Sequence, residues 1–379
     1  MQRPTARWRQ AVVARDCIAV PWVIAMKTRR IILPVLGAVA LLGQSAHRAE
    51  AQQTSKTMVP DPGWDCGMPE GIPNPEDGSL ILAIDVPLDR AAAIGKTPYG
   101  ERRVAVGREG SVKGPKFSAM VMPGALDLEL TLANDAIEIE QLLVLEAPDG
   151  SYIYVRSAGT GADSKDVRVV LDFEAPNASE YAWMNSGKYV ARRVLDASAK
   201  TLALSVYDVS DVAVSARKAI RIEKPAGVPA QPWDARKKAP DEIQGEMLIR
   251  ENVTLAPSQS VGPSKRGNRN VIPITGGELS GRIAGKVLMG GADYQNLSPP
   301  AVIDARYLWQ ANDGEIIIVR NAGPFGALVP TFEARADGPY AYLNTGRYLS
   351  SNPGVGQGGV GITMYESTNG LPTSEAESR

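Results

Sequence analysis

The chain of 379 residues is too long for one ordinary domain and matches about two. Its hydrophobic fraction of 44% and its charged fraction of 22% exclude disorder as the main state. With 37 glycines, 28 prolines and only 6% aromatic residues, the composition favours many turns and few long helices.

The N-terminal region has the layout of a secretory signal peptide. Residues 26–30 (MKTRR) form a basic segment, residues 31–43 an apolar run, and Ala49-Glu50-Ala51 a small-x-small cleavage site. The apolar run is shorter than the roughly 20 residues that a membrane-spanning helix needs. We therefore expect residues 1–51 to be an N-terminal extension plus a cleaved signal peptide, with Met26 as the true start. The mature protein is then secreted or periplasmic; an uncleaved N-terminal anchor is the alternative.

Removal of residues 1–51 restricts the chemistry that remains. It leaves 33 basic and 40 acidic residues, a net charge of about −7 without a basic stripe, so neither nucleic acid nor a membrane surface is an expected partner. It also removes His47, which is the one histidine, and leaves Cys66 as the one cysteine. These losses exclude a histidine-dependent nucleophile, a histidine-rich metal site and an intramolecular disulfide. We expect no metal site and no cofactor.

The remaining chain repeats itself once. Residues 149–159 (DGSYIYVRSAG) match residues 313–323 (DGEIIIVRNAG), and residues 181–189 (YAWMNSGKY) match residues 340–348 (YAYLNTGRY). The order is kept while the spacing changes only at turn-rich segments, so each copy should be a domain with its own core. The expected segments are an irregular arm at 52–78, a first domain at 79–212, a linker at 213–242, a second domain at 243–366 and a disordered tail at 367–379.

Within each copy the apolar pattern has a period of two. Short β-branched or aromatic segments are separated by turns such as Pro148-Asp149-Gly150 and Asn312-Asp313-Gly314, which are strong hairpin signals. No segment has a sustained helical period. We predict an all-β protein with two tandem antiparallel β-barrel domains, because closure removes the edge strands of a sheet.

The second copy also resembles a known family. Residues 272–277 (IPITGG), 286–295 (KVLMGGADYQ), 304–307 (DARY), 332–334 (FEA) and 340–344 (YAYLN) occur in the order found in the domain of unknown function 3237 family. The resemblance implies a compact β-barrel with a cavity. The first copy resembles the family more weakly, since Ala125 stands at the position of Gly291 and Leu142 at that of Arg306. We interpret the second domain as the intact copy and the first as a diverged partner.

Strand alternation predicts where a pocket would lie in the second domain. Asp304, Arg306 and Leu308 share one face of a strand, opposite an apolar face. In a barrel the polar face is then a hollow interior. Since a charge in a dry core costs several kcal/mol, we expect Asp304, Arg306, Glu333 and Asp293 to be paired with one another, to line a wet cavity or to face solvent. Tyr340, Tyr342 and Asn344 are expected to share a face of a later strand. The predicted ligand-binding residues are Gly290, Gly291, Asp293, Asp304, Arg306, Glu333, Tyr342 and Asn344.

Three functions are compatible with this pattern. In the first, the barrel binds a small, partly apolar organic molecule and Arg306 fixes its acidic or carbonyl group. In the second, the protein is a cofactor-free isomerase or lyase, in which Asp293 or Glu333 is the general base and Arg306, Tyr340 or Asn344 stabilises the oxyanion. The third is a structural protein whose barrels present surfaces to partners, with the charged residues as a salt-bridge plug.

Overall fold

The computed structural model describes residues 71–212, 219–220, 225–229, 231, 237–356 and 358–369. The predicted signal peptide, residues 52–70 of the arm with Cys66, parts of the linker and the tail from residue 370 lie outside these residues. In the described part of the chain, no helix has the length and hydropathy needed to cross a membrane.

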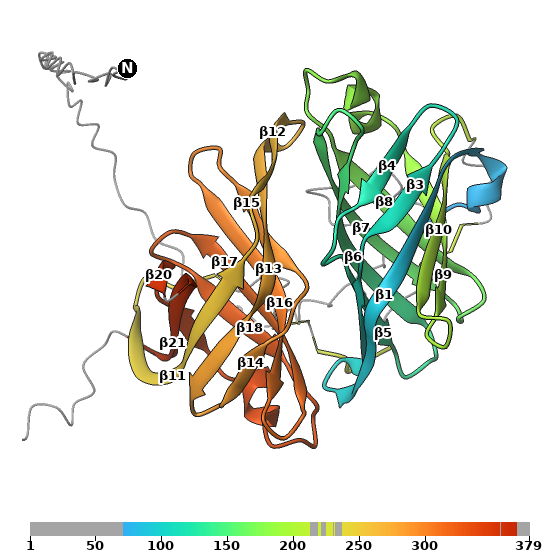
Figure 1. Ribbon diagram of the computed structural model, residues 1–379. Helices are drawn as coiled ribbons and strands as arrows, with labels where there is room; N and C mark the ends of the chain where they lie inside the picture. Colours follow the sequence, from blue (N-terminus) through green and yellow to red (C-terminus); the bar gives the residue numbers. More distant parts are fainter. Residues whose placement is uncertain are drawn as a thin grey trace, which may run out of the picture. The chain divides into compact units, whose positions relative to one another are not determined.

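The first of the two predicted barrels is a closed antiparallel sheet of ten strands (Figure 1). Its strands are neighbours in the order β10-β9-β8-β7-β6-β4-β3-β1-β2-β5, and further pairings of β10 with β1 and of β6 with β5 close it. The strands are β1 (Ser79–Thr97), β2 (Gly100–Gly107), β3 (Gly110–Lys113), β4 (Ser118–Val121), β5 (Leu126–Thr131), β6 (Ile137–Glu146), β7 (Tyr152–Gly161), β8 (Val167–Glu174), β9 (Tyr189–Asp196) and β10 (Thr201–Asp208).

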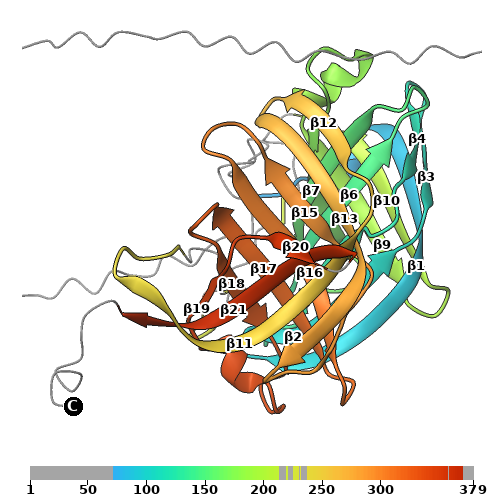
Figure 2. The same cartoon turned by 60° about the vertical axis from the view of Figure 1, so that its left-hand side comes forward.

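The second barrel repeats this plan with shorter closing strands (Figure 2). Its main path is β18-β17-β16-β14-β13-β11-β21-β19, with β12 and β15 beside β13 and β20 beside β21. The strands are β11 (Glu242–Leu255), β12 (Gln259–Ser264), β13 (Gly267–Gly281), β14 (Gly285–Val287), β15 (Ala292–Asn296), β16 (Val302–Ala311), β17 (Ile316–Pro324), β18 (Val329–Glu333), β19 (Tyr348–Ser350), β20 (Gly354–Gly356) and β21 (Gly359–Asn369). The predicted pair of tandem antiparallel barrels is thus confirmed.

The seam between β18 and β19 distinguishes the second barrel from the first. In the first barrel β8 pairs with β9 over four residue pairs. In the second barrel, β18 and β19 do not pair within the described part of the chain. Among the described residues, one backbone hydrogen bond joins β19 to the segment just before β18, from Ser350 N to Leu328 O at 3.1 Å. The difference follows from the sequence, because the second copy has lost five residues between β17 and β18, and Pro353 ends β19 early.

The two predicted hairpin turns are present and equivalent. They join β6 to β7 and β16 to β17, with φ of 81° at Gly150 and 97° at Gly314, a region that glycine enters at little cost. In each turn the preceding aspartate accepts a backbone N–H two residues later, at 3.0 Å in the first and 3.1 Å in the second. This local chemistry fixes the register of the longest hairpin in each barrel.

Each barrel has a packed apolar interior. On β16, Ile303, Ala305, Tyr307 and Trp309 belong to the core of the second barrel, whereas Leu308 faces the other way. Arg306 and Asp304 therefore point out of the barrel, and the expected hollow interior lined by Arg306 is wrong. The apolar face of β16 is the face that points inward. Burying apolar side chains stabilises the fold, whereas burying a charge costs several kcal/mol.

The outward face of β16 packs against the first barrel. Apolar residues from both barrels form one buried interface cluster, which includes Leu126, Leu128 and Leu142 from the first barrel and Tyr294, Leu308 and Ile318 from the second. The contacts obey an approximate two-fold relation: Thr97 and Arg102 bond to Glu333, while their repeat counterparts Ser264 and Arg269 bond to Glu174. The tandem barrels thus associate as a symmetric pair within one chain.

Candidate functional site

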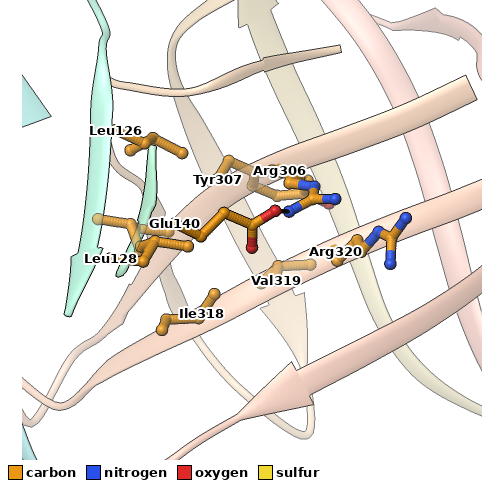
Figure 3. A pocket seen from close by; sticks show the side chains of 9 residues that line it. Leu126, Leu128, Glu140, Arg306, Tyr307, Ile318, Val319 and Arg320 are labelled. Atoms are coloured by element: carbon orange, nitrogen blue, oxygen red, sulfur yellow. Dashed lines mark hydrogen bonds and ion pairs between the residues drawn. The ribbon is translucent and has the colours of Figure 1, made fainter. Parts of the chain in front are cut away.

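Arg306 is the centre of an ion-pair network between the barrels (Figure 3). Its Nε and Nη2 donate to Oδ1 and Oδ2 of Asp304, both at 3.2 Å, and its Nη1 donates to Glu140 of the first barrel. Arg320 on the neighbouring strand donates from Nε to Asp304 Oδ1 at 2.7 Å. The space beside this network measures about 10 Å³, which is room for no more than one water molecule.

The opposite charges of this network stabilise one another. Burial raises the pKa of Asp304, but Arg306 and Arg320 outweigh burial and hold that pKa far below its ordinary value. The same balance, with burial opposed by Arg306 and Arg156, leaves the pKa of Glu140 lowered. Burial disfavours the charged form of Arg306, and its two carboxylates nevertheless raise its pKa. Arg306 thus stabilises the interface, as the salt-bridge alternative proposed, and its donors already face protein carboxylates.

Glu333 is an anchor of the same interface. It is fully buried and accepts bonds from Thr97 Oγ1 at 2.7 Å and Arg102 Nε at 2.9 Å, with Arg102 Nη2 2.8 Å from its other oxygen. Two donors of the first barrel therefore hold a carboxylate that sequence analysis assigned to a ligand or to catalysis.

Gly290 and Gly291 permit close approach of the barrels. Gly291 N donates to Gly124 O of the first barrel at 2.8 Å. A Cβ at Gly290 would lie 2.5 Å from Val106 Cγ1, and one at Gly291 would lie 1.9 Å from Arg306 O. Gly290 thus admits the Val106 side chain of the first barrel, and Gly291 admits the backbone of β16 in its own barrel, so neither glycine makes room for a ligand.

Tyr340, Tyr342 and Asn344 lie at the 3₁₀ helix η5 (Ala341–Asn344), not on a strand as expected. Asn344 Oδ1 accepts from Ala334 N at 2.8 Å, and its Nδ2 donates to Ala334 O at 3.0 Å. Asn185, the last residue of the equivalent helix η3 (Glu180–Asn185), bonds to Ala175 at the same two distances. A pair of bonds shared by both copies indicates a structural clip.

Asp293 faces away from the interface, on the side of β15 opposite Ala292 and Tyr294. Gln295 Nε2 donates to its Oδ2 at 2.7 Å, whereas its Oδ1 is buried without a hydrogen-bond partner among the described residues. Burial raises the pKa of Asp293 to about 6. Of the predicted site residues, it has the least satisfied polar group.

A second buried acid, Glu251 on β11, was not predicted. Tyr307 donates its hydroxyl to Glu251 Oε1 at 2.6 Å, and Trp309 Nε1 donates to Oε2 at 2.9 Å. Burial raises the pKa of Glu251 to about 7, and these two bonds offset it only in part. The sequence did carry a signal, because Tyr307 and Trp309 lie on the apolar face of a predicted strand and have polar groups that need partners.

The largest cavity among the described residues is a cleft of about 540 Å³. It lies between the two barrels and outside both interiors, where β7 and β8 meet β12, β13, β15 and β16. Four cationic side chains line it, namely Arg156, Lys265, Arg266 and Arg269, together with the acidic groups of Asp172, Glu174 and Asp304. Tyr154 and Tyr294 form its aromatic part, with ring centroids 5.3 Å apart. Only Asp304 of these was a predicted site residue, because the others come from separate segments that no spacing rule joins.

Arg269 is held firmly in this cleft. Its Nη2 donates to Glu174 Oε1 at 2.8 Å and its Nε to Glu174 Oε2 at 3.1 Å, and its guanidinium carbon lies 5.0 Å from the ring centroid of Tyr154. Burial disfavours its charge, but Glu174 raises the pKa of Arg269 above its ordinary value. Its Nη1 also donates to Gln295 O at 3.3 Å. The second N–H groups of Nη1 and Nη2 are those that a planar anionic group would use beside the Tyr154 ring.

Lys265 and Arg266 form the rim of the cleft. Lys265 Nζ lies 2.5 Å from Asp172 Oδ1, and Arg266 Nε donates to Asp172 Oδ2 at 2.7 Å. The seven charged groups of the lining sum to +1. Within the described residues, no group of three or more acidic, cysteine or histidine side chains is arranged to hold a metal ion.

The chain matches known proteins that have no assigned role. The family model described as "Protein of unknown function (DUF3237)" matches residues 79–212 and 244–326. A UPF0311 protein from Bradyrhizobium diazoefficiens is 44% identical over 66 residues, which are 17% of this chain and 43% of that protein. A UPF0311 protein from Rhodopseudomonas palustris is 45% identical over 67 residues, 17% of this chain and 44% of that protein. The aligned segment thus spans less than half of either relative.

Two solved structures are similar to part of the chain. A conserved protein of unknown function from Rhodopseudomonas palustris has a TM-score of 0.30 and 24% identity, and the match covers 34% of this chain and 95% of that one. A β-barrel-like protein from Acinetobacter baumannii has a TM-score of 0.31 and 18% identity, with 35% and 94% of the two chains covered.

Proposed function

The chain belongs to the DUF3237 family of proteins of unknown function, and we propose that it binds a small organic anion in the cleft between its two barrels. The observation that carries this proposal is the convergence of four cationic side chains and two tyrosine rings on one hollow of about 540 Å³. That volume lies within the roughly 300–1,000 Å³ range of small-molecule sites.

The two kinds of lining group have separate roles in the proposal. The rings of Tyr154 and Tyr294 contact the flat, apolar part of the ligand, while Arg269 and the rim cations receive its acidic group. Because Glu174 already orders the Arg269 guanidinium, little side-chain entropy is lost on binding. The hypothesis of an organic ligand fixed by an arginine is therefore retained, but with Arg269 in the place given to Arg306.

We place this activity in a secreted or periplasmic protein, on the signal-peptide pattern of residues 26–51. Fractionation of cells that express the full chain, with N-terminal sequencing of the recovered protein, tests this part separately. A cytoplasmic protein that retains residues 26–51 would contradict it.

The binding proposal is tested by calorimetric titration with 4-hydroxybenzoate as a probe. The double variant Lys265→Ala/Arg266→Ala should weaken binding about tenfold or more, since two cations near an anionic ligand are removed. Lys286→Ala is the matched control, because Lys286 is exposed on β14 and does not line the cleft. Equal binding by all three proteins would contradict the proposal.

Proton transfer at Asp293 is a second candidate function. It is favoured by the buried, unpartnered Oδ1 of Asp293 and by its pKa of about 6, which suits a base near neutral pH. Asp293 would remove a proton α to a carbonyl and return it, so that no oxidant is needed. The test is exchange of α-deuterium in a panel of oxo-acids by the native protein and by Asp293→Asn. Exchange that persists in the variant would exclude this role.

A further inference from the structure

The two-fold relation between the barrels creates a counterpart of the open cleft on the opposite side of the interface. There Arg102 takes the position of Arg269, and Glu333 that of Glu174. The supporting turns are equivalent as well: Thr97 Oγ1 donates to Gly100 O at 3.1 Å, and Ser264 Oγ donates to Gly267 O at 3.0 Å. The same hydroxyl–arginine–carboxylate unit is therefore built twice.

The counterpart is occupied by a residue of the chain itself. The primary amide of Gln231, from the segment between the barrels, accepts a bond from Arg102 Nη2 at 3.2 Å and donates through Nε2 to Glu138 Oε2 at 2.8 Å. The repeated arginine thus binds an oxygen acceptor, while Glu138, two strands away on β6, binds the N–H₂ of the same group. Gln231 is an internal example of a ligand for this unit.

The open cleft differs at the residue that contacts the amide nitrogen. Glu138 on β6 corresponds to Val302 on β16, since each is paired with an equivalent residue of the preceding strand. Val302 is 38% exposed and lines the cleft. The open cleft therefore keeps the arginine, Arg269, which can bind an acceptor. It has no carboxylate at the position of Glu138, where the counterpart binds a donor.

The rim changes in the same direction. Pro98 and Tyr99, in the turn after Thr97, correspond to Lys265 and Arg266 in the turn after Ser264. At these positions one negative charge is lost and two positive charges are gained. Asp172, which pairs with both of these cations and corresponds to Thr331 of the counterpart, returns one negative charge. The net change opposes a neutral amide that needs an acceptor and favours a ligand with two acceptor oxygens and a negative charge.

We propose that the open cleft selects a carboxylate over the corresponding carboxamide, and that Val302 determines this choice. This inference rests on the proposed function. A carboxylate presents its acceptor oxygens to the N–H groups of Arg269 that Glu174 and Gln295 do not use, and it meets no acid at the position of Glu138. A carboxamide would leave its N–H₂ beside the apolar side chain of Val302, where a donor without a partner is costly.

The experiment compares 4-hydroxybenzoate with 4-hydroxybenzamide by calorimetry on the full chain. The native protein should prefer the carboxylate by about tenfold or more, the ratio expected when a charge-assisted bond is exchanged for an unpaired donor. Val302→Glu restores the acid of the counterpart and should bring the two affinities close together or reverse their order. Val302→Leu enlarges the side chain without adding an acceptor or a charge and should keep the preference for the carboxylate.

The possible results separate the two proposals. If the native protein binds neither probe, the proposed binding function fails and the selectivity fails with it. If it binds both probes equally, or if Val302→Glu leaves the ratio unchanged, ligand binding stands and the inference about Val302 is overturned. If Val302→Leu and Val302→Glu shift the ratio alike, side-chain size rather than the added carboxylate governs the choice, which also overturns it.

Discussion

The interiors of the two barrels have the same strands around them and different polar groups inside. In the first barrel Asp127 accepts two bonds from Arg193, at 2.8 and 2.6 Å, and a third from Gln141 at 2.6 Å. In the second, the equivalent acid is Asp293, and the position of Arg193 corresponds to Asn352, whose amide binds the backbone of Gly326 instead. One copy has neutralised its interior acid, while the other has kept it without a cation.

Glu251 continues this contrast. Its counterpart in the first barrel is Ile84, and those of Tyr307 and Trp309 are Leu143 and Leu145, all in the apolar core. The first barrel thus neutralises its interior acids with Arg193, whereas the second holds two buried acids, Asp293 and Glu251, with no cation paired to them among the described residues. Because retained strain of this kind costs stability, the second barrel is the place to look for chemistry and the first for support.

The largest expected effect concerns the first barrel, whose interior acids are neutralised by Arg193. Arg193→Met leaves Asp127 and Glu129 buried without their cation, and we expect the free energy of unfolding to fall by about 3–5 kcal/mol in urea titrations. Arg192→Met is the control, since Arg192 bonds to the exposed Glu76 and should cost less than about 1 kcal/mol. Equal losses in the two variants would mean that the interior network contributes nothing special.

The retained acid of the second barrel predicts a pH dependence. The pKa of Glu251 is about 7 in the folded protein against an ordinary value of 4.5. The folded state therefore holds a proton that the unfolded state releases, and stability should fall as pH rises from about 4.5 to about 7. Comparison with Glu251→Gln should reveal roughly 3 kcal/mol of this fall.

The control for this measurement is the exposed Glu278, whose replacement by Gln should leave the pH profile unchanged. Asp293→Asn should remove a second contribution of the same sign, at somewhat lower pH, since the pKa of Asp293 is about 6. A stability that is flat between pH 5 and pH 7 in the native protein would contradict the burial of these acids.

The smallest expected effect is a loss of stability at Gly291, compared with the equivalent Ala125 of the first barrel. Gly291→Ala places a Cβ against Arg306 O at a φ of 74°, so we expect a loss of about 1–3 kcal/mol. At the equivalent position Ala125 is 6% exposed and tolerated, and Ala125→Gly should cost about 1 kcal/mol or less. If both substitutions cost the same, the close approach of the Gly291 backbone to β16 is not a constraint.

The sequence determined the architecture well because the strand pattern and the hairpin turns are local. The period of two along β16 and the aspartate–glycine turns before β7 and β17 sufficed to predict two tandem barrels. The direction of the β16 faces was misjudged, since the pattern states that Arg306 and Tyr307 point oppositely but not which of them points inward. The interface of the partner barrel, which neutralises Arg306 with Glu140, supplied that information.

The candidate site was less accessible to sequence analysis. Arg269, Tyr154 and Tyr294 belong to three strands from two domains, and only the docking of the barrels brings them together. Alignment of the two copies did carry one usable signal. It pairs Arg102 with Arg269 and Glu333 with Glu174, so a charged pair repeated in both halves was visible before its geometry was known.

The most direct test of the binding account is to locate a bound probe by anomalous diffraction from crystals soaked in 4-bromobenzoate. The account predicts a bromine peak between the barrels near Tyr154 and Tyr294, with the carboxylate toward Arg269. A peak confined to the interior of the second barrel beside Glu251, or the absence of an ordered peak at a concentration that saturates binding in solution, would contradict it.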